Sequence, residues 1–294
     1  MLIVTNPGSN LTGEEIEQYR IRLTPQQIIV DGESHDTRLG VSHDTIDGWV
    51  RTAKVHPYVV GTTAAEFVSL FRELAHVDRE ILAVMTSRKI IGSHDAAVSA
   101  ARTLMQMPGH ADVRIGIADT GTTDLGAGLA CMLAAEAASR DRSLLQIEAL
   151  IAAYRSNARF VFHAESLDYL VKGGRATAVR AWLANVLGVR PVIGFVDGEV
   201  KVIRKIGTKA DVTAELVAEL ERTIKPGTPI WAGVMHGDAP VRAAEVARAI
   251  GKRFDAKRLT VRSLSPSIYL HGGPGCVGVA AIDLTTLPAD GFGS

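Results

Sequence analysis

The sequence predicts an α/β protein with two domains, an N-terminal parallel-sheet βαβ domain and a C-terminal α+β domain. Three observations favour this fold class. The chain has 294 residues, about twice the length of a typical single domain. In the first half, strand-like apolar runs alternate with segments that open helices, as in parallel βαβ units. In the second half, Asp197-Gly198-Glu199 separates two apolar runs and predicts an antiparallel hairpin, which has no counterpart in the first half.

The elements of the first half follow in order. A short strand and a polar turn lead to a helix opened by Thr12 and Glu15, whose side chains can cap each other's backbone N–H groups. The second strand ends at the Asp31-Gly32 turn. The expected strands cover residues 2–5, 27–30, 58–60, 81–85 and 113–118, and the expected helices begin near Thr12, Ala64, His94, Gly128 and Ser143. We expect the first domain to span residues 1–156.

The pattern changes in the second half, which we expect to form a domain over residues 157–294. A strand and a short helix end at Gly173-Gly174-Arg175, and another helix is expected after Arg175. The further expected strands are 159–163, 192–196, 200–204, 229–235, 259–264 and 279–282, the helices are 165–172, 211–223 and 240–252, and a glycine-rich loop covers 272–278. The hairpin within this order predicts a mixed α+β arrangement.

Charge and composition exclude several classes of protein. Lys+Arg and Asp+Glu both total 32, so the broad positive field that nucleic-acid binding needs is absent and no nucleic-acid partner is expected. The two cysteines lie far apart and no secretory leader precedes the first apolar run, which favours a reducing, cytoplasmic setting. The most apolar long stretch, residues 127–138, is interrupted by Glu136 and is too short for integral membrane insertion.

Known catalytic and metal motifs are missing from the sequence. The segment 121–126 has the glycine spacing of a phosphate loop but lacks the Lys-Ser/Thr that would follow. The sequence contains no H-E-x-x-H, C-x-x-C, EF-hand or G-x-S-x-G pattern. We therefore expect no catalytic residues, no metal site and no cofactor.

Two loops of the first half carry hydroxyl groups at expected helix starts. Thr63 is positioned as an N-cap with Glu66 as its capping partner, and a well-capped helix is the simpler interpretation of that pair. Gly92 and Ser93 begin the next helix after a strand. Helix N-termini present unpaired N–H groups and partial positive charge, and in open α/β sheets such loops meet at the carboxyl ends of the strands. Together the loops predict a site for a carboxylate or phosphate.

A third loop, residues 271–275, places His271 beside backbone with little steric bulk. The imidazole is either a ligand-binding group or a structural hydrogen bonder. One alternative function is a small-molecule hydrolase or phosphotransferase that uses His271 as general base or phosphate acceptor, although the sequence offers no paired carboxylates or activated nucleophile. Another alternative is a ligand-free interaction module.

Seven segments together carry a family resemblance. They are Ile3-Val4-Thr5-Asn6, Asp31-Gly32, Ser87 to Ser93, Leu167 to Arg175, Arg190-Pro191, Asp197-Gly198 and His271 to Gly275. In this order they resemble the DegV family over nearly the whole chain. The most specific motifs are the Leu-x-Tyr-Leu-x-x-Gly-Gly-Arg run and the terminal His-x-Gly-Pro-Gly.

The resemblance implies a two-domain EDD-type fold with a ligand cleft between the domains. It implies that one long-chain fatty acid is buried there as a ligand rather than a cofactor. It further implies that this lipid-binding protein is not itself an enzyme, and that it presents the carboxylate to a separate ATP-using fatty acid kinase, which makes acyl phosphate for phospholipid metabolism.

The resemblance also implies site residues. An ungapped match places Val59 and Val60 at a Thr-Ser pair of the family, whereas a short gap places Thr62 and Thr63 there. We adopt the gap because the site needs hydroxyl groups. The implied ligand-binding residues are then Thr62, Thr63, Ser87, Gly92, Ser93, His271 and Gly272. Arg175 is a candidate for docking the kinase or, equally, for a structural role.

Overall fold

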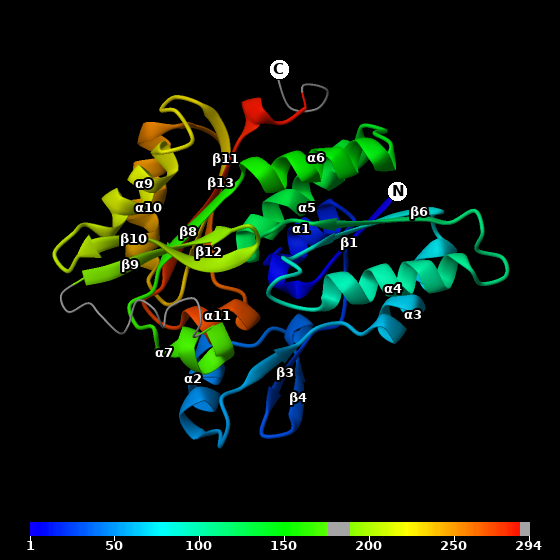
Figure 1. Ribbon diagram of the computed structural model, residues 1–294, viewed down its shortest axis with the longest axis horizontal. Helices are drawn as coiled ribbons and strands as arrows, with labels where there is room; N and C mark the ends of the chain where they lie inside the picture. The colour runs from blue at the N-terminus through cyan, green and yellow to red at the C-terminus, as the bar shows by residue number, and fades with distance from the viewer. Residues whose placement is uncertain (176–188, 289–294) are drawn as a thin grey trace.

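The computed structural model describes residues 1–175 and 189–288. Within these residues the strands form three sheets, of four, six and three strands. Figure 1 shows the four-stranded parallel sheet and its helices on one side of the molecule, the six-stranded mixed sheet on the other, and the small three-stranded sheet projecting below them. The helix expected after Arg175 lies outside the described residues.

The parallel sheet has the strand order β2-β1-β6-β7, and its paired strands all run parallel. Its strands are β1 (Leu2–Thr5), β2 (Arg22–Leu23), β6 (Glu80–Met85) and β7 (Arg114–Asp119). The helices of this half are η1 (Pro7–Ser9), α1 (Gly13–Gln18), α3 (Ala64–Ala75), α4 (Ser93–Met105), α5 (Asp124–Ser139) and α6 (Leu144–Asn157).

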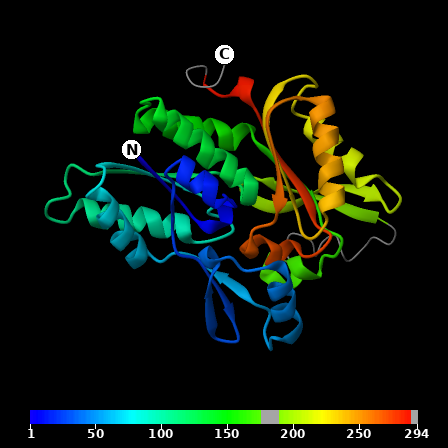
Figure 2. The same cartoon turned by 180° about the vertical axis from the view of Figure 1, so that it is seen from behind.

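The two faces of the parallel sheet are covered by different helices. Ile81 and Ala83 of β6 pack into the core formed with α3 and α4. Leu82 and Val84 point the other way, into the core formed with α5 and α6. Burial of alternate residues on both faces is typical of parallel sheets. The view from behind in Figure 2 shows the same layers, and the predicted βαβ domain is confirmed for these strands.

Two expected strands of the βαβ domain belong instead to the small sheet, and this part of the prediction is wrong. The small sheet has the order β4-β3-β5 and is antiparallel. Its elements are β3 (Gln27–Val30), β4 (Glu33–Asp36) and β5 (Tyr58–Val60), with η2 (Thr37–Leu39) and α2 (His43–Thr52) between β4 and β5. Asp31 and Gly32 both have positive φ, so the chain reverses directly after β3. A strand as short and exposed as β5 also cannot fill the middle of a sheet that is buried on both faces.

The mixed sheet has the order β10-β9-β8-β13-β11-β12. Its strands are β8 (Arg159–His163), β9 (Val189–Val196), β10 (Glu199–Gly207), β11 (Pro229–His236), β12 (Asp255–Ser263) and β13 (Val277–Asp283). The helical elements of this half are α7 (Asp168–Leu170), η3 (Val171–Arg175), α9 (Val212–Glu221), α10 (Pro240–Arg253), α11 (Pro266–Gly272) and η4 (Leu284–Thr286). The hairpin prediction is confirmed, because β9 and β10 pair antiparallel across Asp197 and Gly198, which both have positive φ.

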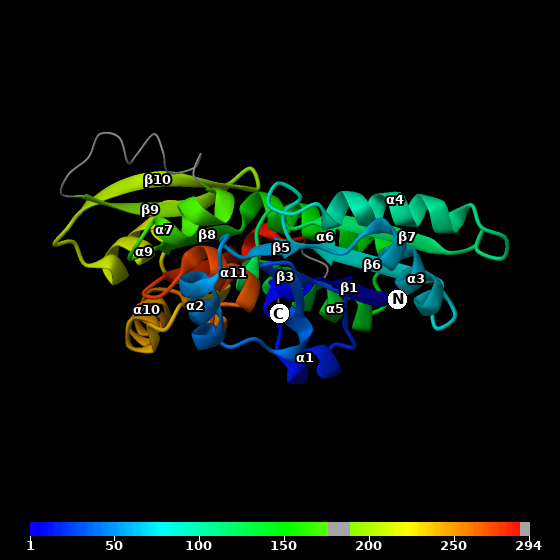
Figure 3. The ribbon, with the colours of Figure 1, turned by 90° about the horizontal axis from the view of Figure 1, so that it is seen from below.

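The predicted glycine-rich loop begins one residue too early, because Gly272 is the last residue of α11. Ser265 precedes this helix and Pro266 opens it, a sequence signal for a helix start that outweighs the following glycines. The left-handed φ of Gly273 ends the helix. His271 therefore lies in the last turn of a helix. Figure 3 shows α11 beside α2, with which it is in contact.

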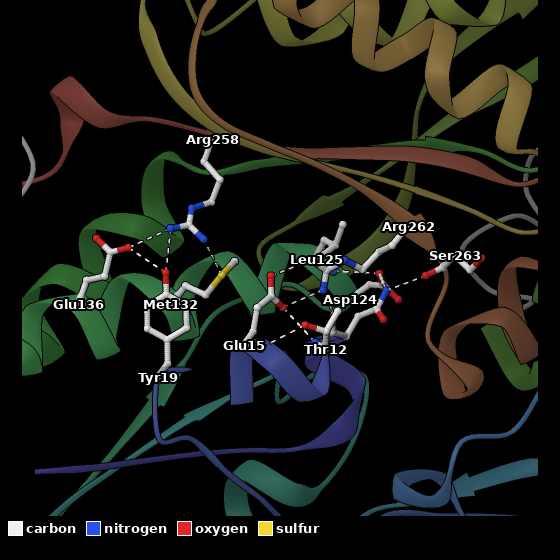
Figure 4. Close-up of polar contacts among 11 residues, drawn as sticks. Thr12, Glu15, Tyr19, Asp124, Leu125, Met132, Glu136, Arg258, Arg262 and Ser263 are labelled. Atoms are coloured by element: carbon white, nitrogen blue, oxygen red, sulfur yellow. Dashed lines mark hydrogen bonds and ion pairs between the residues drawn. The ribbon is translucent and has the colours of Figure 1, made fainter. Parts of the chain in front are cut away.

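Polar contacts join the two halves of the chain on the side of β12 (Figure 4). Arg262 donates hydrogen bonds to both carboxylate oxygens of Glu15 on α1, at 2.9 and 2.8 Å. Arg258 donates to Glu136 of α5 at 3.1 Å and lies over the ring of Trp231. These contacts fix the mixed sheet against α1 and α5, and so position the surfaces that enclose a cavity between the two halves.

No helix within the described parts of the chain is long and apolar enough to cross a lipid bilayer. The predicted domain boundary after Ser156 lies one residue before the end of α6.

Candidate functional site

A cavity of about 910 Å³ lies between the two halves of the chain. Its apolar wall includes Val59, Ile90, Ile91, Phe160, Phe162, Leu170, Phe195, Val200, Leu264 and Ile268. Its polar groups include Asn6, Gln26, Thr86, Thr123, Arg175, Ser267 and His271. Small-molecule sites are typically concave and apolar, with a few polar groups that fix orientation. The wall composition fits a ligand with a long apolar part and a polar head.

The apolar floor of the cavity comes from neighbouring strands of the mixed sheet. Phe160 and Phe162 are two residues apart on β8, so their side chains lie on the same face. Phe195 of β9 packs against Phe160 with the ring centroids 5.0 Å apart. Three aromatic rings on one sheet face provide a continuous apolar surface along the cavity.

His271 places an unpartnered nitrogen at one end of this surface. Its Nδ1 is shielded from water and has no hydrogen-bond partner among the described residues. Gly173 lies so close that a Cβ there would collide with the imidazole. Burial, together with the smaller effect of the positive charges of Arg175 and His56, lowers the pKa of His271 to about 3. The side chain is thus a neutral imidazole with one unused hydrogen-bonding position.

Arg175 provides a cation beside His271. Its Nη1 donates to the carbonyl of Gly173 at 2.8 Å and its Nη2 to the carbonyl of Ile90 at 2.9 Å, so the guanidinium bridges the two halves. Burial lowers the pKa of the guanidinium, and no described carboxylate pairs with it. A partly buried cation without a counter-ion is costly unless an anion binds. An anionic head group would meet this need.

Ser93 carries a second unpartnered polar atom near the cavity. The residue is 1% exposed, and in the described structure its Oγ has no hydrogen-bond partner. It is the first residue of α4, directly after the N-cap residue Gly92. A Cβ at Gly61 would collide with this Oγ and lie 3.0 Å from Ile91, a cavity residue. The hydroxyl is therefore available next to the cavity wall.

The wall contributed by α11 is fixed by a hydrogen-bonded cluster that includes helix α2. Tyr269 donates to Asp238 at 2.6 Å, and His43 of α2 lies 2.7 Å from the other oxygen of Asp238. Tyr169 of α7 donates to Asp47 of α2 at 2.7 Å. The cluster ties α2 from the first half to α7 and α11 from the second, so both halves hold the cavity in shape.

A sequence model described as "Uncharacterised protein, DegV family" matches residues 1–284. The chain belongs to the DegV family. A DegV domain-containing protein of Mycobacterium tuberculosis is 28% identical over 291 residues, which cover 98% of this chain and 99% of the relative. One of Streptomyces coelicolor is 28% identical over 282 residues, covering 94% and 96%.

Solved DegV structures have the same fold. A Thermus thermophilus DegV family protein described by its fatty acid binding superposes with a TM-score of 0.86 at 23% identity, covering 96% of this chain and 99% of that one. DegV of Bacillus subtilis, described as a fatty acid binding protein, gives 0.82 at 20% identity, covering 96% and 98%. A stearic acid-binding protein of Eubacterium ventriosum gives 0.81 at 19% identity, covering 96% and 97%. The predicted two-domain α/β fold is confirmed.

The residues that the DegV resemblance implied are not all in one place. His271, Gly272 and Arg175 line the cavity, whereas Ser93 and Gly92 lie behind Ile91 at the start of α4. Arg175, the candidate for kinase docking, directs its guanidinium toward Gly173 and Ile90.

Three implied hydroxyl groups have partners elsewhere. The Oγ1 of Thr62 lies 2.7 Å from the hydroxyl of Thr24 and 2.6 Å from the carbonyl oxygen of Pro25. Thr63 forms the capping box of α3 with Glu66. Ser87 donates to the carbonyl of Gly198 at 2.7 Å and so ties its loop to the hairpin turn. None of these side chains lines the cavity, whereas Val59 does.

Several cavity residues were not anticipated. The aromatic floor of Phe160, Phe162 and Phe195 was assigned only to strands, although the Phe-Val-Phe alternation in β8 indicates that two rings share one face. Asn6 and Thr86 follow β1 and β6, at the carboxyl edge where ligands of open sheets bind. Neither the three phenylalanines nor Asn6 and Thr86 stand at a hydroxyl-bearing start of a predicted helix, the signal used to predict the site. In residues 1–175 and 189–288, no three His, Cys, Asp or Glu side chains are grouped to hold a metal ion.

Proposed function

We propose that this DegV family member binds one long-chain fatty acid in the cavity between its two halves. The observation that carries the proposal is the apolar cavity lined by a cation, Arg175, and an imidazole, His271, neither of which has a carboxylate partner among the described residues. The relatives of known structure that are described as fatty-acid-binding support the same ligand class.

The acyl chain supplies most of the affinity in this proposal. Burying about fourteen methylenes at roughly 0.8 kcal/mol each contributes about 11 kcal/mol, against association costs of at least about 4 kcal/mol. A helix terminus contributes only about 0.3–2 kcal/mol to binding a carboxylate. The head-group residues therefore act chiefly to orient the carboxylate.

We propose that the carboxylate lies at the end of the cavity lined by Arg175 and His271. In this arrangement Arg175 supplies the positive charge, and His271 donates from Nδ1 as a neutral imidazole. The unpartnered hydroxyl of Ser93 supplies a further donor from the start of α4. Gly272 lies beside His271 in the cavity wall, where a Cβ would press against Leu264 and Cys276. This proposal keeps four implied residues and does not use Thr62, Thr63 or Ser87.

We also propose that the bound acid is the substrate of a separate ATP-using kinase. In that reaction a carboxylate oxygen attacks the γ-phosphorus of ATP, ADP leaves, and acyl phosphate forms. The chain itself lacks the Lys-Ser/Thr that a nucleotide phosphate loop requires after residues 121–126. ATP must then be supplied by the partner, and Arg175 serves to orient the carboxylate for transfer.

Hydroxylamine trapping of acyl phosphate tests whether this chain or a separate kinase transfers the phosphoryl group. Protein loaded with palmitate and mixed with ATP alone is expected to yield no acyl hydroxamate. Formation of hydroxamate in this mixture, which contains no kinase, would show that this chain transfers the phosphoryl group itself, and the carrier proposal would fail.

Ligand content is the direct test of binding. Denaturing extraction and mass spectrometry of the purified protein are expected to release a stoichiometric long-chain fatty acid. Ser93→Ala is expected to weaken palmitate binding to the delipidated protein about tenfold, since a hydrogen bond to the charged carboxylate is lost. Calorimetric titration measures this change.

Two further variants sharpen the result. Ser143→Ala removes a serine hydroxyl from the start of another helix, α6, away from the cavity, and should leave palmitate affinity unchanged. Thr63→Ala separates the two alignments, because a large loss of affinity there would return the head group to the Thr62-Thr63 loop. Protein that purifies empty and takes up no added palmitate would refute the binding proposal.

A further inference from the structure

A second cavity of about 1290 Å³ lies behind the first. Two residues, Phe160 and Phe195, line both cavities. The second cavity is bordered by polar groups of both halves of the chain. These groups include Thr120, Thr122, Arg155, Arg159, Glu219 and Thr223. The two aromatic rings thus form a partition between an apolar chamber and a polar one.

The geometry of the sheet places the two rings side by side. β8 and β9 pair antiparallel with Val161 opposite Gly194, so Phe160 and Phe195 are opposite one another one step further along. Their ring planes are inclined at 76°, an edge-to-face contact. Phe160 is only 6% exposed, and a Cβ on Gly126 would lie 2.9 Å from its ring. The partition is therefore closely packed.

The strand register separates the partition from His271, because a Cβ on Gly272, the residue after His271, would lie 3.2 Å from the Sγ of Cys276, directly before β13. In the β8 and β13 pair, His163 is opposite Val277, the residue after Cys276, and Phe160 is opposite Ala280. Phe160 and His163 are three positions apart on β8, which corresponds to about 10 Å along the strand. A ligand whose head group is near His271 therefore extends along β8 toward Phe160.

The chamber behind the partition is unsuited to an apolar chain end. Thr122 is 5% exposed and its Oγ1 lacks a hydrogen-bond partner in the described residues. Arg155 is paired with Asp119 at 2.6 Å, and Arg159 donates to Thr223 at 3.1 Å. A methyl end that entered this space would bury polar groups without replacing their contacts with water.

We propose that Phe160 and Phe195 are specificity-determining residues that set the upper length of the acyl chain. This inference rests on the proposed fatty acid function. The rings stop the methyl end of the chain, and the polar chamber behind them gives a longer chain no apolar continuation. Removal of either ring frees the apolar space that the ring occupied in front of the polar chamber, and a longer chain can place its last methylenes there.

The test compares affinity across a series of saturated acids from laurate to behenate. Phe160→Ala and Phe195→Ala are expected to move the optimum to longer acids and to bind behenate about tenfold more tightly than the wild type does, through added methylene burial. Phe162→Ala is the matched control. It removes the same ring from the same strand face but lines only the first cavity, so it should weaken binding of all lengths without moving the optimum.

The outcomes distinguish a failure of the proposed chain-length role from a failure of the proposed fatty acid binding. An optimum that stays at the wild-type length in both alanine variants would overturn the partition while leaving fatty acid binding intact. Wild-type protein that binds no member of the series would instead refute the proposed function. If an alanine variant fails to fold, Phe195→Leu provides a smaller opening, for which the optimum must still move in the same direction.

Discussion

Replacement of Asp124 by alanine is expected to lower the free energy of unfolding by about 3–4 kcal/mol. Asp124 is completely buried where α5 begins. Its carboxylate accepts hydrogen bonds from Asn10 at 2.7 Å and from Leu125 N–H at 2.9 Å; Figure 4 shows Asp124 beside Leu125. It also accepts hydrogen bonds from the N–H and hydroxyl of Ser265 at 2.9 and 3.0 Å. Alanine leaves these buried donors without an acceptor, and alanine also adopts the left-handed φ of this position poorly.

The measurement is denaturant unfolding of the full chain, supported by thermal melting, in which the loss corresponds to a Tm lower by about 6–16 °C. Burial raises the pKa of Asp124 despite the four opposing hydrogen bonds. The folded-state pKa is therefore above the unfolded one, so this group's contribution to stability is greatest in acid and declines as the pH rises through the folded-state value. Asp124→Asn avoids the buried charge, tolerates positive φ, and should lose less than alanine does.

Asp44→Ala provides the matched control, since Asp44 is an exposed aspartate in the first turn of α2. Its loss should be within about 1 kcal/mol. Equal losses in Asp44→Ala and Asp124→Ala would mean that the contacts from Asn10 and Ser265 do not hold the two halves together.

Elements decided by a few adjacent residues were predictable from the sequence. Thr12, Thr63 and Ser143 each form the capping box that their spacing indicates. The Asp197-Gly198 pair makes the hairpin turn because both residues can adopt positive φ. In each case the hydrogen bond or dihedral angle that decides the structure lies within four residues of the signal.

Features decided by distant residues were not predictable in this way. The hydroxyl of Thr62 is engaged by Thr24, which comes from a separate strand connection, and no local pattern reveals that the group is already occupied. Arg175 donates to Ile90, a contact across 85 positions of sequence. The motifs that resemble the DegV family correctly indicated the family, and one of them contains His271, which lines the cavity. Which hydroxyl groups remain free depended on tertiary packing that a single sequence does not display.

The same packing explains why the head-group end and the tail end of the cavity differ. At the head end, Arg175 and His271 are partly buried and have no carboxylate partner within residues 1–175 and 189–288, an arrangement that costs stability in the free protein. At the tail end, the apolar rings of Phe160 and Phe195 pack against one another and need no polar partner. In the proposed complex, the carboxylate therefore lies at the end with Arg175 and His271, and the methyl end of the acid lies at the end with Phe160 and Phe195.

Binding of a fatty acid is expected to raise the pKa of His271 by about 1–3 units, the effect of a negative charge within a few ångströms. In the free protein, burial together with the charges of Arg175 and His56 lowers this pKa to about 3. His271 should then stay neutral down to about pH 4. Because the folded-state pKa is below the unfolded one, the neutral side chain contributes stability above about pH 6.5, and this contribution is lost as the pH falls from there toward the folded value.

Histidine NMR titration of free and palmitate-loaded protein measures the change, with His271→Gln used to assign the signal. His76, at the exposed C-terminal end of α3, provides the reference signal, whose chemical shift at any one pH should be the same with and without palmitate. By linkage, a pKa that rises by one unit on binding corresponds to about tenfold tighter binding of the ionised acid once His271 is protonated.

Arg175→Gln tests whether the palmitate carboxylate itself, rather than a change at Arg175, raises the pKa of His271 on binding. Without the guanidinium, the pKa of His271 in the free protein should rise, because one of the charges that lowers it is gone. A carboxylate beside His271 must still raise the pKa further when palmitate is added to this variant. If palmitate binds tightly but leaves the His271 titration unchanged in both proteins, the carboxylate lies elsewhere. The acid would then be oriented with its head away from α11, and the wall of Phe160 and Phe195 would face a different part of the chain.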